Sequence, residues 1–146
     1  MLADAVDSRA DLADLRDQAL MLAGMAVEVL LKAIAVSDPE TRAIVTGPKK
    51  PRTNGAAKVW DAFYSHDLVD LAASAGITLD ELLEPTATGL SQNVLWKDRY
   101  VLPREKGIEH LARRDLNPPV EQARMLIERV VREVEVRPYA NAKVPA

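Results

Sequence analysis

Arg104 and His110 are the two residues of this sequence whose types and spacing are best suited to chemistry. Five residues separate them. An imidazole titrates near neutral pH, and a guanidinium group can bind a phosphate through two hydrogen bonds. The histidine could therefore transfer a proton and the arginine could bind the negative charge of a phosphate ester. Residues six apart on a continuous helix are separated by about 240°, so the two side chains meet only if Pro103 and Gly107 break the helix. The alternative is an ordinary surface histidine beside Glu109.

The composition excludes several other kinds of site. The 146 residues include no cysteine and two histidines, which excludes disulfides, thiolate nucleophiles and a zinc site built from histidines alone. The run Ser65-His66-Asp67 has the residue types of a catalytic triad. Consecutive side chains on a helix point about 100° apart, however, so these three cannot line up as one. We expect neither a metal nor a cofactor.

Basic residues are clustered, although the chain as a whole carries a net charge of -3. A chain of this charge does not attract nucleic acid as a whole, so any contact with phosphate must come from local clusters. The alternative is that these are solvated charges balanced by nearby acids. The candidate RNA-binding residues are Lys49, Lys50, Arg52, Arg99, Arg113 and Arg114.

Helical periodicity dominates the sequence and predicts an all-α domain over residues 1–137, followed by a flexible tail over 138–146. The longest predicted helix covers about residues 8–36 and ends at Asp38-Pro39, because proline lacks the amide hydrogen. At about 100° per residue its apolar positions form one stripe, which we expect to face the core. The stripe comprises Leu12, Leu15, Ala19, Leu22, Ala23, Ala26, Leu30, Ala33 and Ile34, with Leu20, Val27 and Leu31 broadening one side.

Further helices are predicted from their start and stop signals. Ser65 is the expected N-cap of a helix over residues 66–75 that stops at Gly76. Thr78 is expected to cap a short helical start that Pro85 interrupts, and a third main helix follows. Asn117 with its two following prolines predicts the start of the last helix. Four to five helices with short connections predict an up-and-down bundle.

No segment of the sequence is predicted to enter a membrane or to direct export. The apolar run over residues 19–36 carries Glu28 and Lys32 near its centre, and each charge would cost roughly 2.5–3.5 kcal/mol in the middle of a bilayer. The mainly acidic N-terminus does not have the pattern of a signal peptide. We expect a cytoplasmic protein.

Three short segments stand out together: Leu31-Lys32-Ala33 at the end of a helix with Gly24 and Glu28, then His66 and Leu68, then Trp96 before Arg99-Tyr100. They resemble the HEPN family of small helical bundles. Many HEPN proteins have a first helix with small residues and a glutamate that ends in Leu-Lys-Ala, then a His-x-Leu entry to the second helix, and an aromatic residue before Arg-Tyr near the end of the third. The corresponding residues, in that order, are Gly24, Glu28, Leu31, Lys32, Ala33, His66, Leu68, Trp96, Arg99 and Tyr100. The resemblance covers roughly residues 12–135 by order.

The resemblance implies a choice of activities. The family includes metal-independent ribonucleases, toxin-antitoxin components and inactive members. Its ribonucleases carry an arginine followed after four to six residues by a histidine, usually at a dimer interface, and RNA cleavage through the 2′-hydroxyl needs such a base, acid and cation. Arg104 and His110 match this signature. The family's Arg-Tyr aligns best with Arg99, after which no histidine stands at the required distance.

Glu28 and Lys32 are spaced to form an i,i+4 ion pair on a solvated face, worth about 0.2–0.5 kcal/mol. Met21 and Met25 share that side of the helix, which we expect to meet another helix or a second subunit. Arg99 has a structural alternative as the partner of a carboxylate such as Glu28. We assign structural roles to Glu28, Trp96, Tyr100 and His66, the last as packing at a helix entry.

Two functions remain open. The first is a non-catalytic, dimeric helical interaction module of toxin-antitoxin or defence type, which binds a cognate partner protein and has RNA or a nucleotide as a candidate ligand. The second is a metal-independent endoribonuclease that uses Arg104 and His110. The acidic net charge and the missing histidine after Arg99 favour the first.

Overall fold

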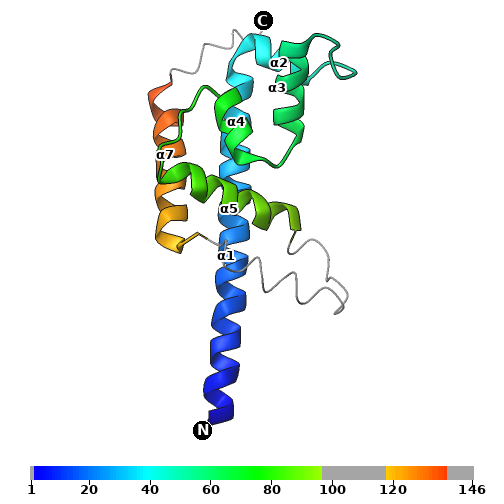
Figure 1. Ribbon diagram of the computed structural model, residues 1–146. Helices are drawn as coiled ribbons and strands as arrows, with labels where there is room; N and C mark the ends of the chain where they lie inside the picture. The colour runs from blue at the N-terminus through cyan, green and yellow to red at the C-terminus, as the bar shows by residue number, and fades with distance from the viewer. Residues whose placement is uncertain (1, 97–117, 138–146) are drawn as a thin grey trace, which may run out of the picture.

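All regular secondary structure in the described part of the chain is helical in a computed structural model, which confirms the all-α prediction for that part. The structure describes the backbone of residues 2–96 and 118–137, and the side chains of residues 15–92 and 118–137. The helices, labelled as in Figure 1, are α1 (Leu2–Ser37), α2 (Pro39–Val45), α3 (Asn54–Tyr64), α4 (Leu68–Ser74), α5 (Leu83–Trp96) and α7 (Val120–Val136).

Helix α1 organises the fold. Its C-terminal half packs against α2, α4, α5 and α7, whereas its N-terminal part projects away from the other helices (Figure 1). Helix α5 crosses α1 steeply, and α7 runs beside α1 in the same direction. The described helices therefore do not alternate in the expected up-and-down order, and α2 and α3 are two helices that the sequence patterns did not predict.

Local signals explain where the helices begin and end. Asp38-Pro39 ends α1 as predicted and also begins α2, because the Asp38 carboxylate accepts a hydrogen bond from the Thr41 amide at 2.7 Å. That amide lowers the pKa of Asp38. Gly76 follows α4 with a φ of +69°, a left-handed conformation that glycine adopts without strain, so the predicted stop is confirmed.

Three predicted helix starts are wrong. Asp67, not Ser65, caps α4, since its carboxylate accepts the amides of Val69 and Asp70 at 2.9 and 3.1 Å. Pro85 lies in the first turn of α5 and does not interrupt a helix there, because a proline in a first turn removes an amide that has no helical partner. The last helix begins at Val120 with Pro119 as its N-cap, in place of Asn117.

The core forms where α1 meets α4, α5 and α7. Its largest fully buried apolar side chains come from all four helices and pack as one cluster. They are Leu20, Val27, Leu31, Leu68, Leu71, Leu90, Leu126 and Val130, and the Thr86 side chain is also fully buried.

The face of α1 that points into this core overlaps only in part with the predicted stripe, of which Ile34 is buried. Leu20, Val27 and Leu31, expected only to broaden the stripe, are buried at 0–1% exposure. Leu15 and Leu22, expected within the stripe, are 59% and 61% exposed. Helix α1 is apolar around much of its circumference, so the helical period alone fits more than one choice of inward face.

The first testable prediction concerns this orientation. Leu31→Ala should lower the free energy of unfolding by about 2–5 kcal/mol, because it leaves a cavity in the core. Leu82→Ala, at a 44% exposed position outside the core, is the matched control and should change it by less than about 0.5 kcal/mol. Urea denaturation followed by circular dichroism measures both. Equal effects would contradict the described orientation of α1.

Candidate functional site

Glu28 is a charged residue within the helical packing, and two side chains, Lys32 and His66, bind its carboxylate. Its side chain is 8% exposed overall. One carboxylate oxygen lies 2.6 Å from Lys32 Nζ one turn along α1, and the other lies 3.0 Å from His66 Nδ1 at the entry to α4. The carboxylate therefore joins two elements that are 38 residues apart in sequence.

The ionised form of Glu28 is the one that the surroundings favour. Burial raises the pKa of the Glu28 carboxyl, but hydrogen bonds from Lys32 and His66 outweigh this effect and hold the pKa below its usual value. The Lys32 ammonium also lies 5.4 Å from the centre of the Phe63 ring, a distance suited to a cation–π contact. Both carboxylate oxygens are thus committed to partners within the fold.

Two sequence expectations about this cluster meet different outcomes. The Glu28–Lys32 pair forms as predicted, but its face is not solvated, because Glu28 packs against the start of α4. His66 lies at a helix entry as expected, and it also bonds Glu28, a contact that sequence spacing did not predict. The expected pairing of Arg99 with Glu28 lies outside the described residues.

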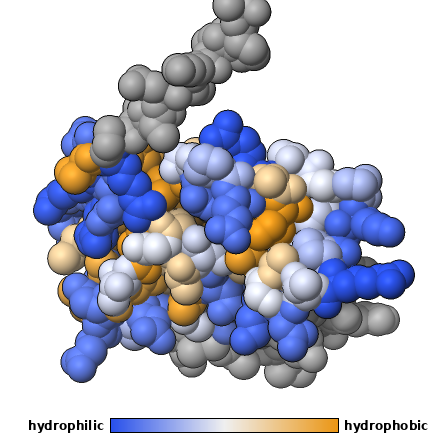
Figure 2. Space-filling model, turned by 90° about the horizontal axis from the view of Figure 1, so that it is seen from above, coloured by the Kyte–Doolittle hydropathy of each residue, from blue (hydrophilic) through white to orange (hydrophobic). Residues whose placement is uncertain are grey.

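The basic segment before α3 is exposed to solvent. Lys49, Lys50 and Arg52 are all exposed, and Lys50 Nζ pairs with Asp61 Oδ2 at 2.7 Å. Asp61 belongs to α3, in which the ring centres of Trp60 and Tyr64 are 4.7 Å apart. Seen from the end of the molecule where α1 stops, polar side chains cover much of the surface, with apolar patches between them (Figure 2).

The remaining candidate residues are not placed relative to this cluster. The proposed catalytic pair, Arg104 and His110, lies outside the described residues. The same holds for the other residues of that segment with an assigned role, Arg99, Tyr100, Arg113 and Arg114. The backbone of Trp96 ends α5, and its side chain also lies outside the described part.

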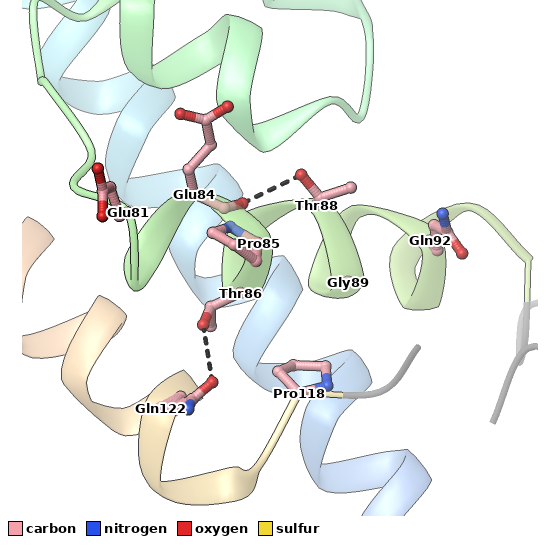
Figure 3. Close-up of a pocket in the computed structure, with 9 residues that line it drawn as sticks. All are labelled: Glu81, Glu84, Pro85, Thr86, Thr88, Gly89, Gln92, Pro118 and Gln122. Carbon is pink, nitrogen blue, oxygen red and sulfur yellow. Dashed lines mark hydrogen bonds between the residues drawn. The ribbon is translucent and has the colours of Figure 1, made fainter. Parts of the chain in front are cut away.

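A groove of about 620 Å³ opens between the first turns of α5 and the start of α7 (Figure 3). The Thr86 hydroxyl donates to Gln122 Oε1 across it at 3.3 Å. Glu81 and Glu84 at its edge give it an acidic rim, which is unsuited to phosphate. The described residues contain no cluster of three or more histidine, aspartate or glutamate side chains that could hold a metal ion. The lining residues are Glu81, Glu84, Pro85, Thr86, Thr88, Gly89, Gln92, Pro118 and Gln122.

The outward face of α1 is the feature that sequence reasoning placed wrongly. Six small or apolar residues on it are exposed at alternating steps of four and three, the spacing that keeps side chains along one seam of a helix. They are Leu15, Ala19, Leu22, Ala26, Val29 and Ala33, here called the outer row. Five of these six residues were assigned from the sequence to the core stripe, and Val29 was not.

The side of α1 that was predicted to meet another helix or a second subunit is a different one, and it meets another helix. Glu28 on that side packs against the start of α4 and Gly24 is buried, whereas Met21 is half-buried and Met25 is 37% exposed beside the outer row. By length and composition the stretch Leu15–Ser37 is also apolar enough to cross a membrane, a test that the core helix of a soluble protein passes as well.

Comparison of the chain with protein-family models, curated proteins and solved structures finds no match.

The second prediction concerns the charge of Glu28. Because its pKa is lowered in the folded state, its stabilising contribution is complete above the ordinary glutamate value of about 4.3 and is lost as the pH falls below it. Glu28→Gln should cost about 1–3 kcal/mol at neutral pH, the usual value of hydrogen bonds to a charged group. The difference from wild type should shrink in acid.

The measurement is urea denaturation at pH values from 7 down to 3. Glu135→Gln, at an exposed position on α7, is the control and should follow the wild-type profile. A Glu28→Gln difference that stays constant with pH would contradict the assigned role of the carboxylate.

Proposed function

We propose that this protein is a HEPN-like helical interaction module that acts as a dimer and does not itself catalyse a reaction. The observation that carries the proposal is the outer row of α1, which is apolar, regularly spaced and exposed. Single exposed apolar residues are normal on soluble proteins, but contiguous apolar patches usually mark an interaction surface. Its three large residues, Leu15, Leu22 and Val29, are 59%, 61% and 67% exposed.

The described chemistry supports a structural role for the charged cluster. A reactive carboxylate or imidazole needs a face open to substrate, whereas both oxygens of Glu28 are bonded to Lys32 and His66. Removing one partner of a buried charge pair leaves the other uncompensated, so such a cluster stabilises one arrangement of the helices. Glu28 thus fixes α1 against the start of α4.

The spatial arrangement also supports the resemblance to HEPN proteins. Glu28 and His66 belong to two of the separate segments on which that resemblance rests, and the fold brings their side chains into contact. Within a HEPN-like frame, a toxin-antitoxin or defence setting with a cognate partner protein is the biological context that we propose. RNA or a nucleotide is its candidate ligand, for which the exposed Lys49 and Arg52 are available.

The third prediction tests self-association. Light scattering after gel filtration should give twice the mass of one 146-residue chain for the wild type. Leu22→Glu should give the single-chain mass, because it places a charge in the apolar row and no core residue is touched. Val136→Glu, at a 77% exposed position on α7, is the control and should stay dimeric. A wild type that remains monomeric at high micromolar concentration would overturn the dimeric module.

A metal-independent endoribonuclease is the second candidate, and the spacing of Arg104 and His110 favours it. In that mechanism a histidine either takes the proton from the 2′-hydroxyl as a base or gives a proton to the leaving oxygen as an acid, and an arginine binds the phosphate charge. Lys49, Lys50 and Arg52 would then contribute to RNA affinity.

The fourth prediction separates the two candidates. Wild-type protein incubated in EDTA with a pool of single-stranded and folded RNA should leave the RNA intact if the protein is a non-catalytic module. Arg104→Ala and His110→Ala are prepared in parallel. Cleavage by the wild type that both variants lose would establish the ribonuclease and refute the non-catalytic proposal.

A further inference from the structure

The outer row of α1 alternates large and small side chains along its length. Leucine or valine occupies positions 15, 22 and 29, and alanine occupies positions 19, 26 and 33. None of the six residues is charged, and all six are exposed. A helix that packed against this row would need small residues opposite the leucines and large residues opposite the alanines, because protein interiors pack without voids.

When a second copy of the row runs in the opposite direction, its small residues lie opposite the large residues of the first. Each large residue can be paired with an alanine that lies equally far from Gly24 on its other side. A half-turn about an axis at the height of Gly24 therefore places every large residue opposite an alanine of the second copy. The pairs are Leu15 with Ala33, Val29 with Ala19, and Leu22 with Ala26. Three matched pairs with one common midpoint give a single register in which every large residue meets an alanine.

A two-fold axis of this kind is what a symmetric dimer requires. In an isologous interface, the same patch of both subunits meets itself, so residue i contacts residue j and residue j contacts residue i. An antiparallel pair of α1 helices centred on Gly24 meets this condition with large against small in all six layers. A parallel pair would place leucine against leucine and alanine against alanine, which alternates crowded layers with empty ones.

We propose that the occupant of the outer row is a second copy of this chain, packed antiparallel along α1 with the two-fold axis at Gly24. This inference rests on the proposed function, which it deepens by naming the partner and the register. The row runs along α1 on the side away from Val27 and Leu31, which are buried in the core, so the core helices do not cover it.

Cysteine cross-linking tests the register directly, because the natural chain has no cysteine. Ala19→Cys and Val29→Cys are prepared separately, one with an affinity tag so that the mixed dimer has its own size. In the antiparallel register, position 19 faces position 29 of the other copy. Two copies of position 19 are ten residues apart along the axis, roughly 15 Å, far beyond the Cβ separation of about 4 Å that a disulfide needs.

The expected result is a disulfide dimer from the mixture of the two variants after mild oxidation, at least tenfold more abundant than from either variant alone. A mixture of Leu82→Cys and Val136→Cys, both exposed and outside the row, is the control and should stay uncrosslinked. Circular dichroism of the reduced variants verifies that each is folded.

The other outcomes overturn the inference in distinguishable ways. Cross-linking of each variant with itself, and not in the mixture, would establish a parallel pair. A dimer by light scattering that cross-links in no combination would place the interface elsewhere and leave the proposed module intact. A monomer under all conditions would overturn both. Flotation of wild type, but not of Leu22→Glu, with phosphatidylcholine vesicles would make lipid the occupant of the row.

Discussion

The position of α1 is the constraint on which the rest of the structure depends. Helices α2, α4, α5 and α7 each contact it, and its buried residues Leu20, Val27, Leu31 and Ile34 belong to the shared core. A helix with polar residues on one side would have one choice of inward face. Because α1 carries apolar residues on nearly all sides, the helices packed on it fix its rotation, and the opposite apolar face is left outward.

Glu28 adds specificity to this apolar packing. Hydrophobic contacts alone would tolerate a rotation of α1 about its axis, since many of its faces are similar. A carboxylate that is buried must keep its partners, because an uncompensated buried charge is costly. Lys32 is on the same helix and moves with Glu28, whereas His66 belongs to the chain entering α4. The Glu28–His66 contact therefore distinguishes the observed rotation from neighbouring ones.

The parts of the fold that the sequence could predict are those set by local chemistry. Asp38-Pro39 and Gly76 end helices for reasons confined to a few residues, and both were assigned correctly. Pro85 and Asn117 were assigned wrongly because a proline signal fits both a break and a first turn, and a choice between them depends on the surrounding packing. The Glu28–His66 contact joins residues 38 apart, and no periodic pattern encodes such a distance. The inward face of α1 was predicted only in part, for a related reason. Ile34 of the predicted stripe is buried, but five residues of that stripe lie on the outward face.

The register proposed for the dimer also bears on where a shared site can form. Glu28 lies four residues beyond the Gly24 axis, so the two copies of this residue would be eight residues apart along the paired helices, roughly 12 Å. Each Glu28 side chain is buried toward the body of its own subunit, however, whereas the outer row points the other way. Two α1 helices would therefore stand between the two clusters, which makes a composite pocket built from Glu28 and His66 of both subunits incompatible with this dimer. In such an assembly each cluster stabilises its own subunit, and the outer row provides the association.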